Sequence, residues 1–420
     1  MADDPKGLTP ECAVDRRDFM RAVGATAVMA AGGVADGTQT GQADPPAAAT
    51  QQRPYLTNPP DFLDVSRGNP RPHTLKGEQL VKARLTPETW RLEIVSDGTT
   101  QIATPRTLDK GNAVDLPELE KLGIQQSRRF LKAMQCLNIS QPLGQGLWEG
   151  VPLREVVKLV GRMNDIRRVY YWGYHNNDPK QVFQSSLNYT QMMEAPPWEL
   201  GPFVAYRLNG QPISLLRGGP VRMIVPWAHG FKSIKWLQRI VLTNNFQAND
   251  TYAAANNDPE SYLKTAAYVD SGPAAYPAGQ ATVVTGTVMV GLSGLKRVEY
   301  WLRSIAGPPA PLRDDDPVWA TAKWLPCQLE PAPKNWGGTL PTGVLPGGVW
   351  GLDAKTGQPQ QWPLRYSWGL WSVTLRDLKP GTYEFRARAV DMNDFAQPQP
   401  RPYQKSGKNE ILVRQLVVKG

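Results

Sequence analysis

The chain has 420 residues, of which 41% are hydrophobic and 20% charged, as in an ordinary globular protein. Its formal net charge is +9, but lysine and arginine form no long run and no stripe with interleaved aromatics, which argues against nucleic acid as a partner. The three cysteines, Cys12, Cys136 and Cys327, form no CxxC or CxxCH motif, so the sequence predicts no disulfide framework, no zinc site and no c-type haem.

The N-terminal segment has the features of an export signal. Arg16 and Arg17 precede a weakly apolar stretch, residues 22–35, that is rich in Ala and Gly and too short to span a bilayer stably. An arginine pair before such a stretch is typical of twin-arginine signals. We therefore predict a twin-arginine export signal at residues 1–43, a periplasmic location, and a proline-rich linker at residues 44–60.

Residues 61–250 have the mixed pattern of an α+β domain. Some segments have the apolar spacing of a helix, and others have the length and residue types of strands. The predicted helices are 116–122 and 151–161, and the predicted strands are 89–95, 129–136, 167–174, 203–213 (with a turn at Asn209 and Gly210), 221–227 and 235–243.

From residue 265 the pattern changes to short strands of period two with turn residues between them. Such spacing predicts a β-sandwich at residues 265–420. The expected strands are 281–291, 295–304, 371–378 and 381–391, with a long insert rich in Gly, Pro and Trp at 306–362. The predicted fold class is thus α+β, a mixed domain followed by an all-β domain. A plain β-sandwich binding protein would account for the second domain alone.

The stretch GGPVRMIVPWAHGFKSIKW, residues 218–236, places cations around an apolar strand and a glycine turn. Arg222 lies inside the apolar run, and Lys232 and Lys235 follow the turn. A buried cation without a partner costs several kcal/mol. These side chains are therefore either surface charges on an edge strand or a cluster that binds an anion. Phosphate favours several charge-assisted donors and the backbone N–H groups of a tight turn.

These motifs together resemble the sulfite oxidase family of molybdopterin enzymes. The resemblance covers roughly residues 70–400 and rests on VAYRLNGQPI, GGPVRMIVPW and GFKSIKWLQRIVL, and on the cysteine in AMQCLN followed by WEGVPLREVV. LKRVEYWLRS and LKPGTYEFRARAVDMNDFAQPQ are similar to the C-terminal domain of that family. The resemblance implies a molybdopterin domain followed by an immunoglobulin-like dimerisation domain, a molybdenum–molybdopterin cofactor and a homodimer.

The resemblance also implies roles for individual residues. Cys136 would be the protein ligand of molybdenum, and Arg222 and Lys235 would hold the phosphate of the pterin. In RPHTLKG, Arg71 would face the substrate. The full set of implied cofactor-binding residues is His73, Cys136, Arg222, Lys232, Ser233 and Lys235.

Three positions depart from the family pattern. No arginine follows the cysteine, because LNISQPL stands where the family has GNRR. Phe183, in FQSS, stands where the family has its catalytic tyrosine, and Tyr174 and Tyr189 are candidates to replace it. Arg217 stands where the family has a histidine. Arg217, Arg71 and His175 are therefore the candidates for a rebuilt anion pocket.

The sequence leaves several functions open. The first is sulfite-like oxidation of a small oxyanion, with electrons passed one at a time to a separate cytochrome or membrane partner. The second is reduction of an S-oxide, because VPWAHGFKSIK resembles the periplasmic molybdenum subunit that reduces protein methionine sulfoxides. The third is a catalytically degenerate subunit with a structural or assembly role, suggested by the departures at Phe183 and after Cys136.

Overall fold

The computed structural model describes residues 54–251, 258–260, 262–313, 315–398 and 409–420. The contacts divide the chain into two units, Met1–Gln52 and Arg53–Gly420, and all described residues belong to the second. The predicted export signal and most of the predicted linker therefore lie outside the described residues. No helix within the described ranges is long and apolar enough to cross a membrane.

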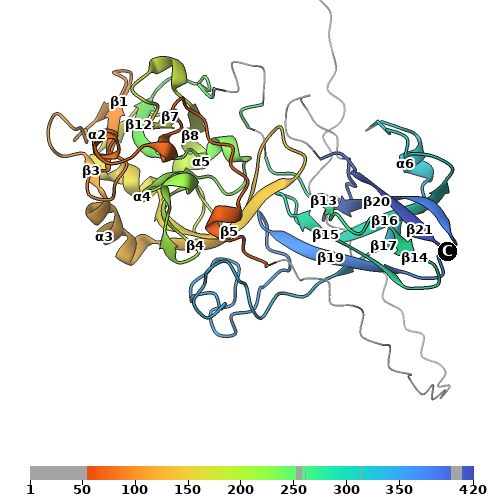
Figure 1. The fold of residues 1–420 in the computed structure, drawn as a ribbon. Helices are drawn as coiled ribbons and strands as arrows, with labels where there is room; N and C mark the ends of the chain where they lie inside the picture. Colours follow the sequence, from red (N-terminus) through yellow and green to blue (C-terminus); the bar gives the residue numbers. More distant parts are fainter. Residues whose placement is uncertain (1–53, 252–257, 261, 314, 399–408) are drawn as a thin grey trace, which may run out of the picture. The chain divides into compact units, whose positions relative to one another are not determined.

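A five-stranded sheet forms one layer of the first domain (Figure 1). Its strands are β1 (Arg91–Ser96), β3 (Val114–Asp115), β7 (Arg168–Gly173), β8 (Gln184–Asn188) and β12 (Leu237–Thr243). The order is β3-β1-β12-β7-β8, with only β1 and β12 parallel. Residues of β7 alternate between buried and partly exposed positions, because successive side chains in a strand point to opposite faces.

A second sheet carries the strand that ends at Cys136. It is made of β4 (Arg128–Gln135), β5 (Pro142–Pro152), β9 (Phe203–Leu208), β10 (Gln211–Pro212) and β11 (Arg222–Ile224). The order is β10-β9-β5-β4, β11 also pairs with β9, and all pairs are antiparallel. The turn between β9 and β10 has positive φ at Asn209 and Gly210, as the Asn-Gly pair predicts.

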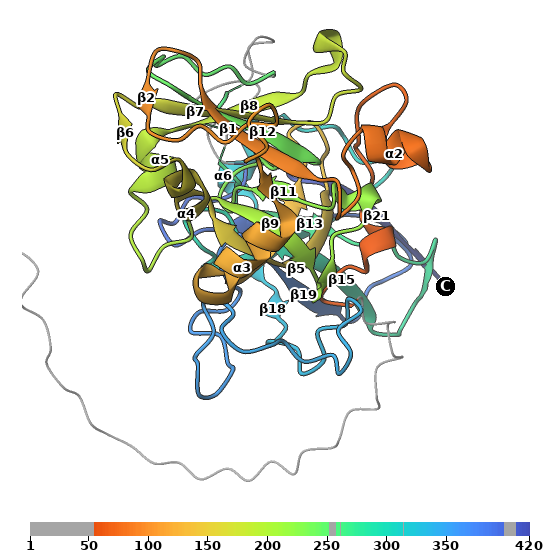
Figure 2. The same ribbon diagram turned by 90° about the vertical axis from the view of Figure 1, so that its left-hand side faces the viewer.

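Helices in the described residues are few and short. The longest is α3 (Leu116–Gln126), which begins where the Asp115 side chain accepts a hydrogen bond from the Glu118 amide. It lies beside β5 (Figure 2). The others are α2 (Glu78–Lys82), α4 (Leu153–Val157), α5 (Tyr189–Met193), α6 (Val318–Thr321) and the 3₁₀ turns η1 (Pro59–Asp61), η2 (Pro72–Thr74), η3 (Lys158–Val160), η4 (Pro179–Gln181), η5 (Leu215–Arg217) and η6 (Gly230–Lys232).

The C-terminal part consists of two sheets that share one apolar core. One contains β13 (Ala266–Val269), β15 (Thr282–Met289), β18 (Gln328–Leu329) and β19 (Trp368–Leu375), in the order β13-β15-β19-β18. The other contains β14 (Tyr276–Pro277), β16 (Arg297–Ile305), β17 (Leu325–Pro326), β20 (Gly381–Val390) and β21 (Val413–Lys419), in the order β14-β21-β20-β16-β17. Side chains from both sheets, including Val284, Trp371, Phe385 and Leu416, meet in this core.

Most of the predicted elements are present, with two informative differences. The predicted helix at 151–161 begins later, because β5 extends to Pro152 through its pairing with β9 and only α4 and η3 are helical. The predicted linker is wrong for its described part, because Tyr55 and Leu56 are buried and pack in one core with Trp336 and Trp368. Apolar area that is removed from water stabilises this segment in place.

Candidate functional site

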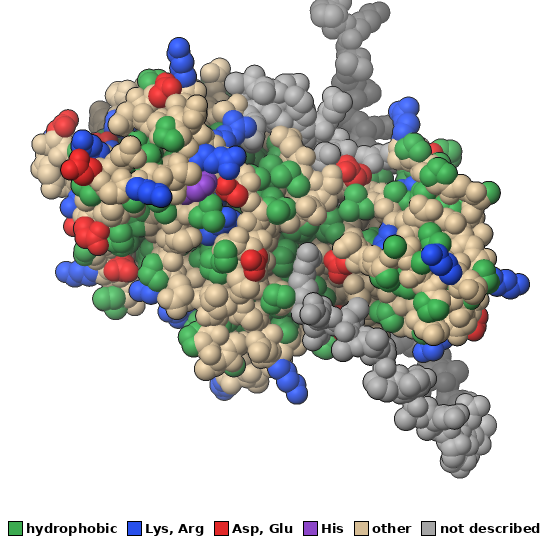
Figure 3. Space-filling view, viewed as in Figure 1, with side chains coloured by type: hydrophobic (Ala, Val, Ile, Leu, Met, Phe, Trp, Pro, Cys, Tyr) green, Lys and Arg blue, Asp and Glu red, His purple; other side chains and the backbone are tan. Residues whose placement is uncertain are grey.

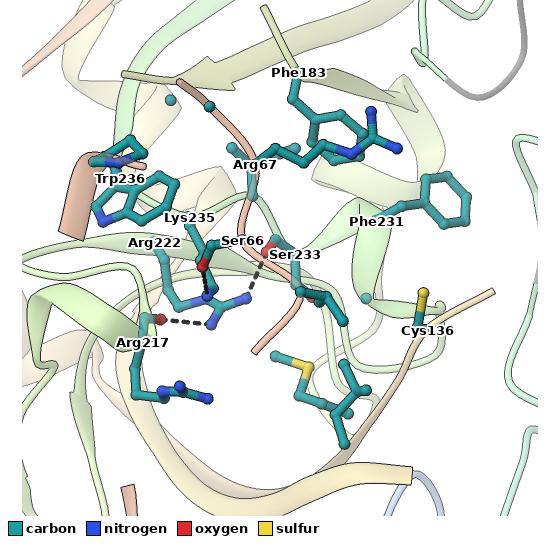
Figure 4. Close-up of a pocket in the computed structure, with 18 of the residues that line it drawn as sticks. Ser66, Arg67, Cys136, Phe183, Arg217, Arg222, Phe231, Ser233, Lys235 and Trp236 are labelled. Atoms are coloured by element: carbon teal, nitrogen blue, oxygen red, sulfur yellow. Dashed lines mark hydrogen bonds between the residues drawn. The ribbon is translucent and has the colours of Figure 1, made fainter. Parts of the chain in front are cut away.

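A cavity of about 140 Å³ is lined by segments that lie far apart in the sequence. Residues 62–68, except Asp64, form one wall, and Cys136 with the end of β4 forms another. Further lining comes from residues 173–175, Gln181 and Phe183, from Arg217 and Arg222, and from residues 230–236 except Lys232. Figure 4 shows the labelled side chains around this cavity, with the sulfur of Cys136 at one end and Lys235 and Trp236 at the other.

Cys136 is placed directly after β4 and is a free, partly buried cysteine. The strand that leads to it is held by a residue that the sequence analysis missed. Lys132 on β4 is fully buried and its Nζ donates to the carbonyls of Pro226 and Ala228, at 2.7 and 3.0 Å. Burial lowers the pKa of Lys132 well below its usual value. Lys132 thus connects the strand before the thiol to the segment that precedes the lining residues 230–236.

Arg222 is a buried cation at the floor of the cavity. Its guanidinium donates to the carbonyls of Arg217 and Ser233, at 2.7 and 2.6 Å, and lies 5.1 Å from the ring centre of Trp148 (Figure 4). Its Nε has no hydrogen-bond partner among the described residues. Burial, followed by the charge of Arg217, lowers the pKa of Arg222 to about 9. A buried cation without a carboxylate partner is well suited to bind an anion.

Arg217 lies on η5 and is also buried. One guanidinium nitrogen donates to the carbonyl of Phe62 at 2.9 Å, while its Nε has no partner among the described residues. Burial lowers the pKa of Arg217. The sequence prediction that Arg217 faces an anion pocket is therefore consistent with its position in the lining.

Lys235 lines the same cavity and lies close to two glycines. Its Nζ donates to Ser66 Oγ at 2.5 Å and to the carbonyl of Leu216 at 2.9 Å, and it lies 3.2 Å from an Asp64 oxygen. A Cβ on Gly173 would lie 2.0 Å from the Lys235 carbonyl oxygen, and one on Gly218 would lie 2.5 Å from Lys235 Cγ. Glycine at both positions therefore permits this close approach.

The pKa of Lys235 predicts a pH dependence of stability. Burial, and next the charge of Arg222, lower this pKa from 10.5 to about 7. Between these two values the unfolded chain binds a proton that the folded chain lacks, so the free energy of unfolding should rise with pH through this window. For Lys235 alone the slope is at most about 1.4 kcal/mol per pH unit.

Urea unfolding of the cofactor-free chain from about pH 7 to 10, compared with Lys235→Met, checks this prediction. We expect the slope to be smaller in the variant. Equal slopes in the two proteins would contradict it. The charged groups that face Lys235 are Asp64, Arg217 and Arg222, and all three remain in the variant.

His73 and Arg71 lie at the edge of the site and do not line the cavity. The His73 ring stacks on Trp236 with ring centres 6.4 Å apart, and its Nδ1 is buried without a partner among the described residues. Burial lowers the pKa of His73, which favours the neutral ring. The Arg71 side chain is 58% exposed and lies 3.5 Å from an Asp64 oxygen. The structure therefore does not support Arg71 as a substrate-facing residue.

Lys232 was expected to bind the cofactor, but the structure places it elsewhere. Its Nζ is buried and lies 2.7 Å from Asp250 Oδ1 and 2.6 Å from the Ser186 carbonyl, and Lys232 is absent from the lining. Its neighbour Ser233 does line the cavity, but the Ser233 hydroxyl accepts a hydrogen bond from the Val225 amide at 3.2 Å. Of these two neighbours, only Ser233 lines the cavity.

Phe183 lines the cavity and faces a side chain that the sequence analysis missed. The Arg67 guanidinium lies 4.9 Å from the centre of the Phe183 ring, a cation–π contact (Figure 4). Tyr174 and His175 also line the cavity, whereas Tyr189 does not. Arg67 is only four positions before Arg71, but it stands outside the RPHTLKG motif from which Arg71 was predicted.

The residues of the cavity fit a molybdenum–pterin cofactor. The donor set combines the thiol of Cys136 with two buried cations, Arg217 and Arg222, whose Nε atoms have no hydrogen-bond partner in the described part of the chain. A thiol is a ligand for soft metal ions, and guanidinium groups are suited to phosphate. On the face drawn in Figure 3, basic side chains gather beside a histidine, with an acidic side chain next to them.

Comparison with known proteins gives the same assignment. A family model described as an oxidoreductase molybdopterin binding domain matches residues 79–251, which include Cys136, Arg217, Arg222 and Lys235. The mitochondrial sulfite oxidase of Macaca fascicularis is 26% identical over 47% of this chain and 37% of its own length. The NADPH nitrate reductase of Emericella nidulans is 26% identical over 48% of this chain and 22% of its own length. The chain thus spans well under half of either relative.

A solved structure shares the fold. The sulfane dehydrogenase SoxCD from Paracoccus pantotrophus aligns with a TM-score of 0.54 and 14% identity, over 79% of this chain and 76% of that chain. This likeness extends the similarity in fold beyond the segment that the family model matches. Taken with the thiol and the cations in one cavity, these matches show that residues 79–251 form a molybdopterin-binding oxidoreductase domain similar to that of the sulfite oxidase and nitrate reductase relatives.

Proposed function

We propose that this protein transfers an oxygen atom to a small sulfur oxyanion, in a sulfite-like oxidation. The observation that carries the proposal is that Cys136 shares one cavity with Arg217 and Arg222, two buried cations. A cationic, partly enclosed cavity attracts a small anion and strengthens its electrostatic binding. The sulfite oxidase relative supports this choice of substrate class.

Each residue of the cavity has a role in this proposal. When bound, the cofactor supplies a metal that exchanges an oxygen atom and electrons. Cys136 would hold the metal, and Arg222 and Lys235 would hold the phosphate of the pterin. Arg217 would orient the anionic substrate. Phe183 excludes water and cannot donate a proton, so Tyr174 would supply the phenolic hydroxyl of the lining for a hydrogen bond.

A second candidate, reduction of an S-oxide, is favoured by one feature of the lining. Phe183, Phe231 and Met134 give the cavity an apolar side near Cys136. Such a surface suits the alkyl groups of a methionine sulfoxide better than a small dianion. In this reaction the S-oxide would lose its oxygen atom, and a donor would supply the electrons to the site.

Metal and pterin analysis combined with turnover assays tests both candidates. Protein matured through its own export signal should contain about one molybdenum per chain and should oxidise sulfite with an artificial electron acceptor. Methionine sulfoxide and nitrate, each with an artificial donor, are the comparison substrates. Preferential S-oxide reduction would replace the first candidate by the second. Absence of metal and pterin, in a host that loads a control enzyme, would favour the degenerate structural or assembly subunit.

The arrangement of the protein in the cell is also part of the proposal. We propose export by the twin-arginine pathway, a periplasmic location and a separate cytochrome or membrane partner that accepts the electrons. We further propose that the two C-terminal sheets form an immunoglobulin-like domain that makes a homodimer. Light scattering of the mature chain should give the mass of a dimer, and a monomeric mass would contradict this part.

A further inference from the structure

Residues 62–68, here called the strap, run along the cavity outside any helix or strand, and all of them except Asp64 line it. At one end, the Leu63 amide donates to the Leu143 carbonyl at 2.9 Å and Arg217 donates to the Phe62 carbonyl. Just beyond the other end, the Asn69 amide donates to the Gln181 side chain at 2.8 Å. The side chains of Leu63 and Val65 are 44% and 41% exposed, so little apolar burial stabilises the middle of the strap.

Lys235 binds the middle of the strap through side chains. Its Nζ contacts Ser66 Oγ at 2.5 Å and Asp64 Oδ1 at 3.2 Å. The other oxygen of Asp64 lies 3.5 Å from Arg71 and 3.9 Å from the His73 ring. One carboxylate therefore faces two cations and an imidazole at the edge of the cavity.

This carboxylate stays charged under all ordinary conditions. Burial alone would raise the pKa of Asp64, but the hydrogen bond from Ser66 and the charge of Lys235 outweigh it and lower the pKa to about 2. Lys235 is the residue of this group that also lines the cavity. An anion that enters the cavity to bind Lys235 must therefore compete with the Asp64 carboxylate, which already contacts Lys235.

We propose that Asp64 occupies the anion-binding position of Lys235 as an internal carboxylate, and that a phosphate monoester displaces it and releases the strap. The proposal rests on the proposed function only in taking the terminal phosphate of the pterin as the natural ligand. A phosphate carries more charge and more acceptor oxygens than a carboxylate. A partly exposed carboxylate–lysine pair contributes only modestly to stability. Phosphate should therefore replace the Asp64 carboxylate at Lys235, whereas anions that bind more weakly should not.

Binding of inorganic phosphate to the cofactor-free full chain tests the first half of the proposal. The Asp64→Asn substitution keeps the size of the side chain and removes its charge. We expect calorimetry to give phosphate binding tighter on the order of tenfold in this variant, because the competing charge is gone. The matched control is Asp61→Asn, an exposed carboxylate just before the strap that accepts a hydrogen bond from the Asn58 side chain. It should bind phosphate like the wild type.

Limited trypsin digestion tests the second half. Arg67 lies in the strap and is exposed, so cleavage after it reports release of the strap. We expect phosphate to accelerate this cleavage in the wild type, and Asp64→Asn to be cleaved rapidly without phosphate. In cofactor-loaded protein, rapid cleavage without added phosphate identifies the phosphate of the pterin as the occupant. A requirement for added phosphate identifies a free anion instead.

Two results would overturn the inference. One is equal phosphate affinity in the wild type and Asp64→Asn, with no effect of phosphate on cleavage after Arg67. The other is tight phosphate binding that persists in the double variant Asp64→Asn/Lys235→Met, because the anion would then bind elsewhere. Neither result depends on whether the protein acquires molybdenum, so failure of the inference is separable from failure of the proposed function.

Discussion

Replacement of Cys136 by serine should reduce redox turnover by more than about 100-fold, because loss of an outer-shell partner alone typically costs roughly 10–100-fold. A serine hydroxyl is not deprotonated at neutral pH and is a poor ligand for a soft metal ion, so the metal would lose its protein ligand. We also expect molybdenum content to fall well below about one atom per chain. The fold should be retained, because Cys136 is partly exposed at the cavity.

The matched control is Cys327→Ser. Cys327 lies between β17 and β18, packs against the core of the C-terminal sheets, and does not line the cavity. Burial, with the nearby charge of Glu299, raises the pKa of the Cys327 thiol to about 12, so it is an inert thiol at neutral pH. This control should keep its metal and its turnover. Turnover in Cys136→Ser equal to that in the control would refute the ligand role of Cys136.

The second large effect is expected at the buried ion pair of Lys232 and Asp250. The atoms Lys232 Nζ and Asp250 Oδ1 are 2.7 Å apart, and the two side chains are only 2% and 0% exposed. Burial lowers the pKa of Lys232, although Asp250 opposes this shift. Asp250→Asn leaves the lysine buried without a counter-charge, which should lower the free energy of unfolding by about 3–5 kcal/mol. The hydroxyls of Ser185 and Ser186 would also lose a charged acceptor.

Urea unfolding of the cofactor-free chain measures this effect. The matched control is Asp394→Asn, which removes a carboxylate at the same 2.7 Å from Lys296, in a pair whose side chains are 45% and 63% exposed. Its cost should be much smaller than that of Asp250→Asn, because water screens an exposed pair. Equal costs at the two sites would show that the Lys232 pair is not buried in solution. Weaker pterin binding by folded Lys232→Met would restore Lys232 as a cofactor residue.

Much of the secondary structure was predictable, and the exceptions have a common cause. Strands such as β1 and β20 alternate in hydrophobicity, so the local sequence pattern is enough to predict each of them. The 11-residue strand β5 was missed because its Gly-rich sequence, PLGQGLWEGVP, has no such period. Its glycines are required by neighbours: a Cβ on Gly150 would lie 2.2 Å from the Val204 carbonyl oxygen. Only pairing with β4 and β9 makes this segment a strand.

The site residues were predictable where they belong to a motif. They were not predictable where the direction of the side chain decides whether the residue reaches the cavity. Cys136, Arg217, Arg222 and Lys235 were named from the sequence, and all four line the cavity. Lys232 was named from the same motif but points toward Asp250. Arg67 was missed, although it lines the cavity that the nearby Arg71 does not reach. Which of these side chains line the cavity cannot be read from the sequence, because the direction of a side chain depends on the packing around it.

The sequence by itself determined the resemblance to molybdopterin oxidoreductases, the chemistry of the thiol and the cations, and the places of the strands that alternate in hydrophobicity. These properties depend on residue types at fixed spacings, and both can be read directly from the sequence. The tertiary structure alone decided which cations face the cavity and which carboxylates already neutralise them. Asp64 and Lys235 are separated by 171 positions yet lie 3.2 Å apart. Such a contact depends on the packing of the whole domain, and no local pattern encodes it.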